Sequence, residues 1–159
     1  MSFKFVLKLA LFFFLFLTSC KKNSDPLPAE LFDMNQTQYL QGKEAEEFVN
    51  KLHLKTVVSE KSDIAFYEGS GGTLTVYITY YQDNKIARQE MNRMINKMQT
   101  TETIFIKGKR MEIADQDVFR CFGMGQTHYI FALDEKLFWV SANTMIAADF
   151  IEYYMDYIN

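Results

Sequence analysis

Cysteine, proline, histidine and tryptophan are scarce in this 159-residue chain, which holds two, two, two and one of them respectively. So few cysteines exclude a small scaffold held together by disulfides. The histidines, His53 and His128, lie about 75 positions apart without a neighbouring cysteine, so the sequence contains no zinc motif. Both prolines fall in one stretch, Pro26 to Pro28, and no proline interrupts the rest of the chain.

Long apolar runs and excess positive charge are also missing. The longest apolar run, Leu9 to Leu17, has nine residues, whereas a helix that crosses a bilayer needs about 20. The formal net charge is −3. A protein that binds nucleic acid non-specifically needs the opposite sign. We therefore predict neither a transmembrane helix nor a nucleic-acid partner.

Motifs for chemistry are weak. The segment Gly69 to Gly72 is rich in glycine but lacks the Lys-Ser/Thr that follows in a phosphate-binding loop, and it fits a turn between two strands. No Gly-x-Ser-x-Gly motif is present. The least implausible enzyme site combines Asp115, Asp117, Cys121 and His128, which could meet only if the later hairpins bring them together. We predict no enzyme activity, no metal and no cofactor.

The N-terminus does carry a clear signal. Lys4 and Lys8 are followed by the apolar run and then by the small residues Thr18 and Ser19 before Cys20. This is the three-part layout of an export signal. The sequence Leu17-Thr18-Ser19-Cys20 resembles the lipobox of a bacterial lipoprotein precursor.

That resemblance implies that a signal peptidase cleaves between Ser19 and Cys20, and that Cys20 receives a diacylglyceryl group and usually a further acyl chain on its amine. Two or three acyl chains give stable membrane attachment. Residues 1–19 are then the signal peptide, residues 20–31 a lipidated flexible tether, and residues 32–159 a single folded domain. In envelope lipoproteins, a lysine such as Lys21 after the cysteine favours the outer membrane, at its periplasmic face or at the cell surface.

Removing the signal changes the counts. It contains two lysines and no acids, so the remaining 140 residues carry 15 basic and 20 acidic side chains, a net charge of about −5. If Cys20 is lipidated, Cys121 has no cysteine with which to form an internal disulfide. A chain of 140 residues is long enough for one domain with a core of ordinary size.

Hydrophobic periodicity predicts the elements of that domain. Helices are expected over residues 43–54, 85–99 and from about 146 onward, the last capped by Asn143 or Thr144. Strands are expected over residues 63–68, 73–81, 117–122, 128–133 and 137–142, with a further hairpin over 103–113 that turns at Lys107 to Lys109. We predict the α+β class, a mainly antiparallel sheet with about three packed helices.

The expected helix 85–99 has two different sides. Its apolar side is read as core, and its cationic side, Lys85, Arg88 and Arg93, is a candidate surface for a partner. We predict an envelope lipoprotein with a non-catalytic role in binding or assembly, attached to the membrane through Cys20 and contacting a ligand or an envelope protein. The alternatives are a carrier of lipid or another small hydrophobe, and an envelope enzyme.

Overall fold

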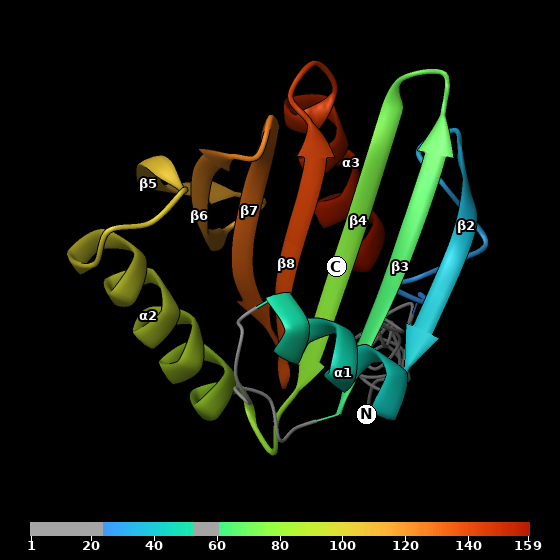
Figure 1. The fold of residues 1–159 in the computed structure, drawn as a ribbon. Coiled ribbons are helices and arrows are strands. Elements are labelled where there is room, and N and C mark those ends of the chain that lie inside the picture. The colour runs from blue at the N-terminus through green and yellow to red at the C-terminus, as the bar shows by residue number, and fades with distance from the viewer. Residues whose placement is uncertain (1–23, 53–60) are drawn as a thin grey trace, which may run out of the picture.

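In the computed structural model, which describes residues 24–52 and 61–159, eight strands form one antiparallel sheet in the order β1-β2-β3-β4-β8-β7-β6-β5 (Figure 1). The strands are β1 (Glu30–Leu31), β2 (Met34–Gln41), β3 (Ser62–Gly69), β4 (Gly72–Tyr80), β5 (Ile106–Ile113), β6 (Gln116–Gly123), β7 (Gln126–Leu133) and β8 (Lys136–Asn143). The helices are α1 (Lys43–Leu52), α2 (Asn84–Thr100) and α3 (Ala147–Ile158).

The predicted α+β class is wrong, because strands dominate the fold. They hold 46% of the described residues and helices hold 30%. A single continuous sheet organises the molecule, which makes it a mainly-β fold with helices packed on the sheet. The class was misjudged because segments expected to be tether or turn, among them residues 30–31 and 107–109, also join the sheet.

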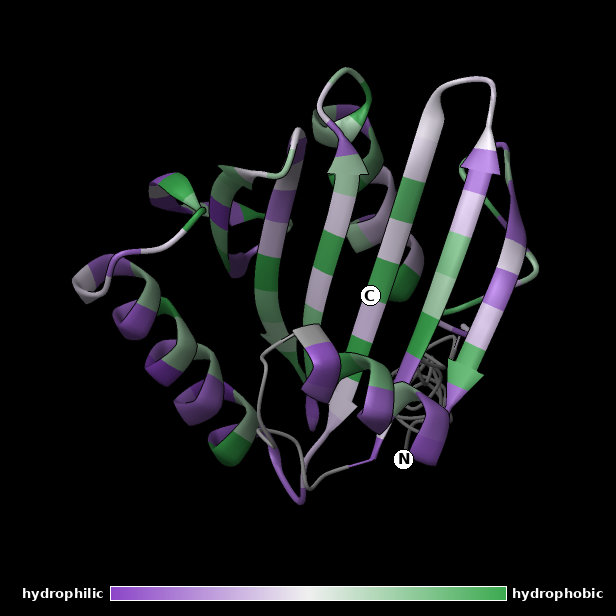
Figure 2. Cartoon of the chain, in the orientation of Figure 1, coloured by the Kyte–Doolittle hydropathy of each residue, from purple (hydrophilic) through white to green (hydrophobic). Residues whose placement is uncertain are grey.

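Helices cover both faces of the sheet (Figure 1). Along β4, Val76 points toward α3, where a large core includes Phe150 and Tyr154. Along the same strand Tyr77 points to the other face, where its ring lies 6.5 Å from Phe48 of α1. Hydrophobic bands alternate along β4 and β8, as this arrangement requires (Figure 2). The predicted alternation of the strand over residues 73–81 therefore marks its two faces correctly.

Helix α2 lies on the same face as α1, over the other end of the sheet. Ala87, Met91 and Ile95 are buried against β6, β7 and β8, as the apolar side of this helix predicts. The helix begins after Asp83, whose side-chain oxygen accepts a hydrogen bond from the backbone N–H of Ile86 at 2.8 Å. Such a cap satisfies one of the free N–H groups at a helix start.

The hairpin expected over residues 103–113 does not form. Strand β5 runs through the expected turn, and its register with β6 shifts between Ile106 and Lys109. The chain reverses instead at Ala114 and Asp115, whose φ angles of 48° and 60° fit a two-residue hairpin turn. The sequence Lys107-Gly108 is thus an irregularity within a strand, with Lys107 at φ 54°.

The closing helix also begins differently. Neither Asn143 nor Thr144 caps α3, whose first turn follows Ile146 without a side-chain cap. Asn143 accepts a hydrogen bond from the backbone N–H of Met145 at 3.0 Å and so stabilises the preceding turn instead. Packing of the buried side of α3 on the sheet compensates for the missing cap.

The first described residues pack against the end of α3. Leu27 and Leu31 are buried in the α3-side core, and the hydroxyl of Tyr154 donates to the carbonyl of Pro26 at 2.7 Å. Residues 24–31, part of the expected flexible tether, are therefore fixed on the folded domain. Residues 20–23 lie outside the described residues, as do the predicted cleavage and lipidation positions Ser19 and Cys20.

Candidate functional site

Three neighbouring strands place polar and aromatic side chains side by side beneath α2. Cys121 on β6 is the cross-strand partner of His128 on β7, and His128 is the partner of Ser141 on β8. Trp139 lies two residues before Ser141 and therefore points to the same face. Phe105, which precedes β5, packs edge-on against the rings of His128 and Trp139, with centroid distances of 5.0 and 5.2 Å.

A hydrogen-bond network joins three of these residues. The Nε2 atom of His128 lies 2.9 Å from the carbonyl oxygen of Gly123, so Nε2 carries the proton, because a carbonyl can only accept. The Nδ1 atom is then an acceptor, 2.8 Å from the hydroxyl of Ser141. The indole N–H of Trp139 lies 3.1 Å from both the Ser141 hydroxyl and His128 Nδ1. Each polar side-chain atom in the network has a partner.

The protonation states of this region argue against nucleophilic chemistry. Burial lowers the pKa of His128, although the hydrogen bond to Gly123 opposes the shift, so the ring is neutral near pH 7. Burial raises the pKa of the Cys121 thiol to about 11, so the thiol stays protonated. Neither nitrogen of His128 is free to accept a proton from Cys121 in this arrangement. The cluster is built to hold the strands in place.

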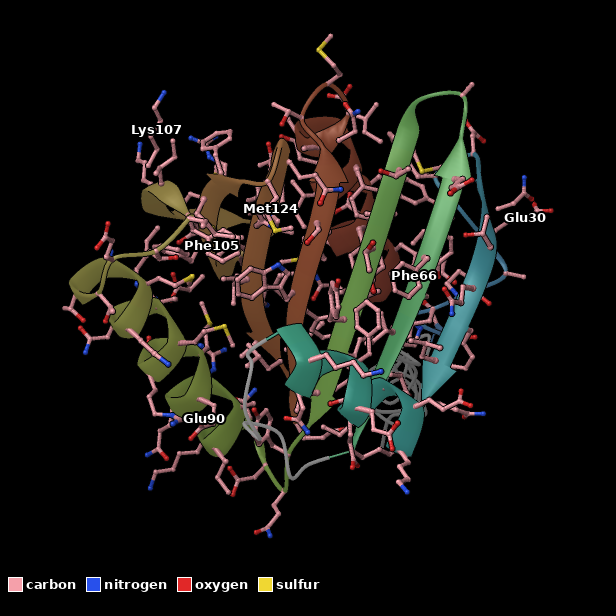
Figure 3. All side chains as sticks on the ribbon, viewed as in Figure 1. Glu30, Phe66, Glu90, Phe105, Lys107 and Met124 are labelled. Atoms are coloured by element: carbon pink, nitrogen blue, oxygen red, sulfur yellow. The ribbon has the colours of Figure 1, made fainter. Side chains whose placement is uncertain are left out.

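A pocket of about 240 Å³ opens beside this cluster, between the end of α2 and strands β5 and β6. Apolar and polar surface contribute about equally to its walls, and Phe105 contacts both the pocket and the ring of His128. Gly108 keeps the pocket wall close, because a Cβ atom there would lie 2.4 Å from Cζ of Phe119. Figure 3 places Phe105 and Lys107 together on this side of the molecule. The lining residues are Met98, Gln99, Phe105, Lys107, Gly108, Phe119 and Cys121.

The four residues named as a possible enzyme site do not converge. Cys121 and His128 are neighbours, but Asp117 lies four residues from Cys121 along β6, about 13 Å away at ~3.3 Å per residue. Asp117 pairs with Arg110 of β5, and Asp115 is exposed in the turn between β5 and β6. Among the residues that the structure describes, no three His, Cys, Asp or Glu side chains are grouped so that they could hold a metal ion.

The candidate partner surface on α2 is solvent-exposed at all three positions, Lys85, Arg88 and Arg93. The Arg88 side chain donates to Asn84 at 2.7 Å, and Arg93 pairs with Glu90 one turn earlier. Ion pairs of this kind on an open helix surface contribute little to stability. The cations are thus arranged along the helix without being buried in the fold.

Sequence reasoning missed the pocket. The methionine side of the helix, which includes Met98, was interpreted as core in preference to a binding surface, and Phe105, Lys107 and Gly108 were assigned to a hairpin. The available signal was Gly108 within an otherwise strand-like segment, because a glycine there can mark an irregularity in a strand as well as a turn. The pocket itself depends on where α2 ends above β6, which local patterns do not determine. In the described segments, no helix has the length and apolar character needed to cross a membrane.

Comparisons with known proteins give information about the fold of this chain only. Neither protein-family models nor curated proteins match the chain. Among solved structures, the chain is similar to a GTP binding regulator from Thermotoga maritima, with a TM-score of 0.50 and 13% identity. The similarity covers 79% of this chain and 78% of that one. At this identity, it shows that the two chains share a fold.

Proposed function

We propose that this protein is a lipid-anchored protein of the bacterial cell envelope that binds a small ligand without transforming it. The lipobox at Leu17 to Cys20 supports the anchor. The pocket beside α2 is the observation that carries the binding role, because it is a concave site in which aromatic and thioether side chains lie next to polar groups.

The pocket suggests the class of ligand. Its volume of about 240 Å³ is below the ~300–1,000 Å³ of sites for drug-sized molecules. The rings of Phe105 and Phe119 and the thioether of Met98 favour a small apolar or aromatic body. The exposed side chain of Lys107 is long and flexible, so its ammonium can reach an anionic group at the mouth. We expect a small molecule with a compact apolar or aromatic body and one acidic group.

The GTP named for the structural neighbour is a useful test ligand. A nucleoside triphosphate needs more space than this pocket offers, and its phosphates need several donors. The glycine-rich segment of this chain, Gly69 to Gly72, joins two antiparallel strands and does not lead into a helix, unlike a phosphate-binding loop. We therefore expect no specific binding of GTP.

Native mass spectrometry of the lipidated protein, gently solubilised from its own membranes, is the first test. A small bound mass supports ligand binding and identifies the compound. Recombinant protein is then titrated with that compound and with GTP by calorimetry. A bare lipidated monomer that binds neither the extracted small molecules of the host nor GTP would refute the ligand-binding role.

Matched variants locate the site. Phe105→Ala should weaken binding about tenfold or more, because it removes one aromatic wall, whereas Phe122→Ala on the opposite face of the sheet should not. Lys107→Asn keeps a residue that tolerates the left-handed backbone and removes the charge. Lys109→Asn, which does not line the pocket, is its control. Equal effects within each pair would place the ligand elsewhere.

The anchor is tested separately. Replacing Cys20 with Ser should leave the precursor uncleaved and without acyl chains, as read by intact mass. Normal processing of this variant would refute the lipoprotein assignment without bearing on the pocket.

A protein partner is the second candidate function. Lys85, Arg88 and Arg93 are exposed along one helix of a protein whose net charge is −3, and such a surface suits an acidic envelope protein. Recovery of a second protein at fixed stoichiometry in the same native spectra would favour this assembly role. Reversing the charge at Arg88 and Arg93 should then abolish the complex.

A further inference from the structure

The beginning of the folded domain is fixed at one edge of the sheet. The Ser24 hydroxyl donates to the carbonyl of Tyr157 at 2.8 Å, and the Tyr157 hydroxyl donates to the carbonyl of Asp25 at 3.1 Å. The Tyr154 hydroxyl donates to Pro26. These bonds hold the chain against the C-terminal end of α3, next to the edge formed by β1 and β2. The chain that precedes Ser24 therefore joins the domain at this edge of the sheet.

The proposed lipid anchor lies close by in the sequence. Cys20 precedes Ser24 by four residues, and a fully extended chain covers at most ~3.6 Å per residue, or about 14 Å in all. The sheet is much wider, because seven intervals of ~4.8 Å between eight strands give about 34 Å. An anchor this short cannot let the domain turn freely, so one surface stays near the bilayer.

Three tyrosines mark that surface, and we refer to Tyr39, Tyr153 and Tyr157 as the tyrosine patch. Tyr39 and Tyr153 are 42% and 43% exposed, and the rings of Tyr153 and Tyr157 stack with centroids 6.2 Å apart. Tyr39 is the cross-strand partner of Ala65, which belongs to the core beneath α3, so Tyr39 lies on the same face of the sheet as α3. Burial, then the charge of Asp63 and a hydrogen bond with it, raises the pKa of Tyr39. Tyrosine suits the headgroup layer of a membrane, because its ring is apolar and its hydroxyl is polar.

We infer that the tyrosine patch is the membrane-facing surface of this protein and rests against the headgroups of the bilayer that holds Cys20. The inference rests on the proposed lipid anchor. It adds the orientation of the domain, which the anchor alone does not give.

The charges of the side chains next to the tyrosine patch indicate which lipid headgroups the patch can contact. The exposed side of α3 next to the patch carries Asp149, Glu152 and Asp156. Acidic side chains are repelled by anionic lipids within about one Debye length, ~8 Å at physiological salt. The patch therefore fits a bilayer of zwitterionic headgroups and should lie less closely on an anionic one.

The pocket lies on the other side of the molecule. The patch is near β2 on the α3 face, whereas the pocket is at β5 and β6 on the α2 face. Figure 3 shows that the two edges of the sheet lie apart, with Glu30 of β1 at one edge and Phe105 and Lys107 at the other. With the patch on the membrane, the pocket opens toward the aqueous phase.

Hydroxyl-radical footprinting tests the orientation with the residues already present. The lipidated protein on phosphatidylcholine vesicles is compared with a soluble form that begins at Lys21. We expect the patch tyrosines to be oxidised about threefold more slowly on vesicles, because headgroups shield side chains held in the interface. Met124, which is 74% exposed in the turn between β6 and β7, should be oxidised equally in both forms.

Two further measurements sharpen the test. Vesicles that contain phosphatidylglycerol should protect the tyrosines less. A variant with about fifteen Gly/Ser residues inserted after Lys22 keeps the lipobox but lengthens the reach several-fold, so the protection should fall toward that of the soluble form. Protection that survives the insertion would overturn the role of the short connection.

The outcomes separate the two proposals. Intact mass without acyl chains would overturn both the anchor and the orientation. A correctly acylated protein whose patch tyrosines are oxidised as fast as in the soluble form, or whose Met124 is protected instead, would overturn the orientation alone.

Discussion

Acidification below neutral pH should destabilise this protein through His128. Burial lowers the pKa of this histidine in the folded protein, whereas the unfolded chain keeps a value near 6.5. The unfolded state therefore binds more protons below that value. Because stability rises with pH wherever the unfolded state binds more protons, the contribution of His128 is complete above about pH 6.5 and is lost as the pH falls below it.

The size of the effect has an upper limit. Between pH 7.5 and 5.5, an unfolded histidine gains most of one proton, whereas a buried histidine with a sufficiently low pKa gains none. The difference in free energy of unfolding is then at most about 1.4 kcal/mol, the equivalent of one pKa unit. The network supplies the reason: protonated Nδ1 would have to donate a proton toward the Ser141 hydroxyl and the Trp139 N–H, and the N–H cannot accept it.

Urea denaturation followed by circular dichroism, at both pH values, measures this loss in the soluble form that begins at Lys21. The control is His128→Gln, which is neutral throughout and keeps a donor for the Gly123 carbonyl. Because His53 and all carboxylates are present in both proteins, their contributions cancel in the comparison. If wild type and variant lose the same stability on acidification, or if wild type loses less, the reasoning about His128 is refuted.

Three other perturbations test the fold and the pocket. Tyr154→Phe should cost about 1–2 kcal/mol in urea denaturation, because it removes the hydrogen bond to the N-terminal segment, while Tyr153→Phe should change stability by less than about 0.5 kcal/mol. Gly108→Ala should cost about 1–3 kcal/mol, because its Cβ would lie 2.4 Å from Phe119; an unchanged melting temperature would contradict this. Cys121, with its pKa raised to about 11, should not react with a chromogenic disulfide reagent at pH 8 until urea unfolds the chain.

The sequence correctly predicted the elements in which apolar residues recur at regular spacing. The strand expected over residues 73–81 and the helix expected over 85–99 correspond to β4 and α2, within a residue at each end. In both, buried apolar side chains repeat with the period of the element, so local pattern and tertiary burial agree. Met91 and Ile95 lie in the core for this reason.

Elements at the edges of the sheet were missed. Strand β2 reads Met-Asn-Gln-Thr-Gln-Tyr-Leu-Gln and is mostly exposed, so no apolar alternation distinguishes it from a loop. Its pairing with β3 and the packing of Leu31 and Met34 determine its conformation. These missing strands also explain why the fold class was misjudged, since the class depends on how much of the chain joins the sheet.

The prediction for residues 103–113 was wrong because it relied on the residue types that usually form turns. Lys107-Gly108-Lys109 has the composition of a hairpin turn, whereas Ala114-Asp115 lacks glycine and asparagine, the usual residues at positive φ. The actual turn is set by the pairing of Arg110 with Phe119 and of Ile113 with Gln116. Several residues of the pocket lie in this wrongly predicted segment, so the pocket could not be predicted from the sequence.

The positions of the two proposed functional regions bear on what kind of binding protein this is. A carrier that takes lipid directly from its own membrane needs its pocket near the bilayer. Here the pocket lies five strands from β2, about 24 Å at ~4.8 Å per strand, and on the opposite face of the sheet. A connection that reaches about 14 Å from Ser24 to the proposed anchor at Cys20 cannot bring the pocket to the bilayer. This geometry favours a ligand that arrives through water over one that leaves the bilayer. It also leaves α2, which carries the exposed Lys85, Arg88 and Arg93, on the face of the sheet away from the proposed membrane contact.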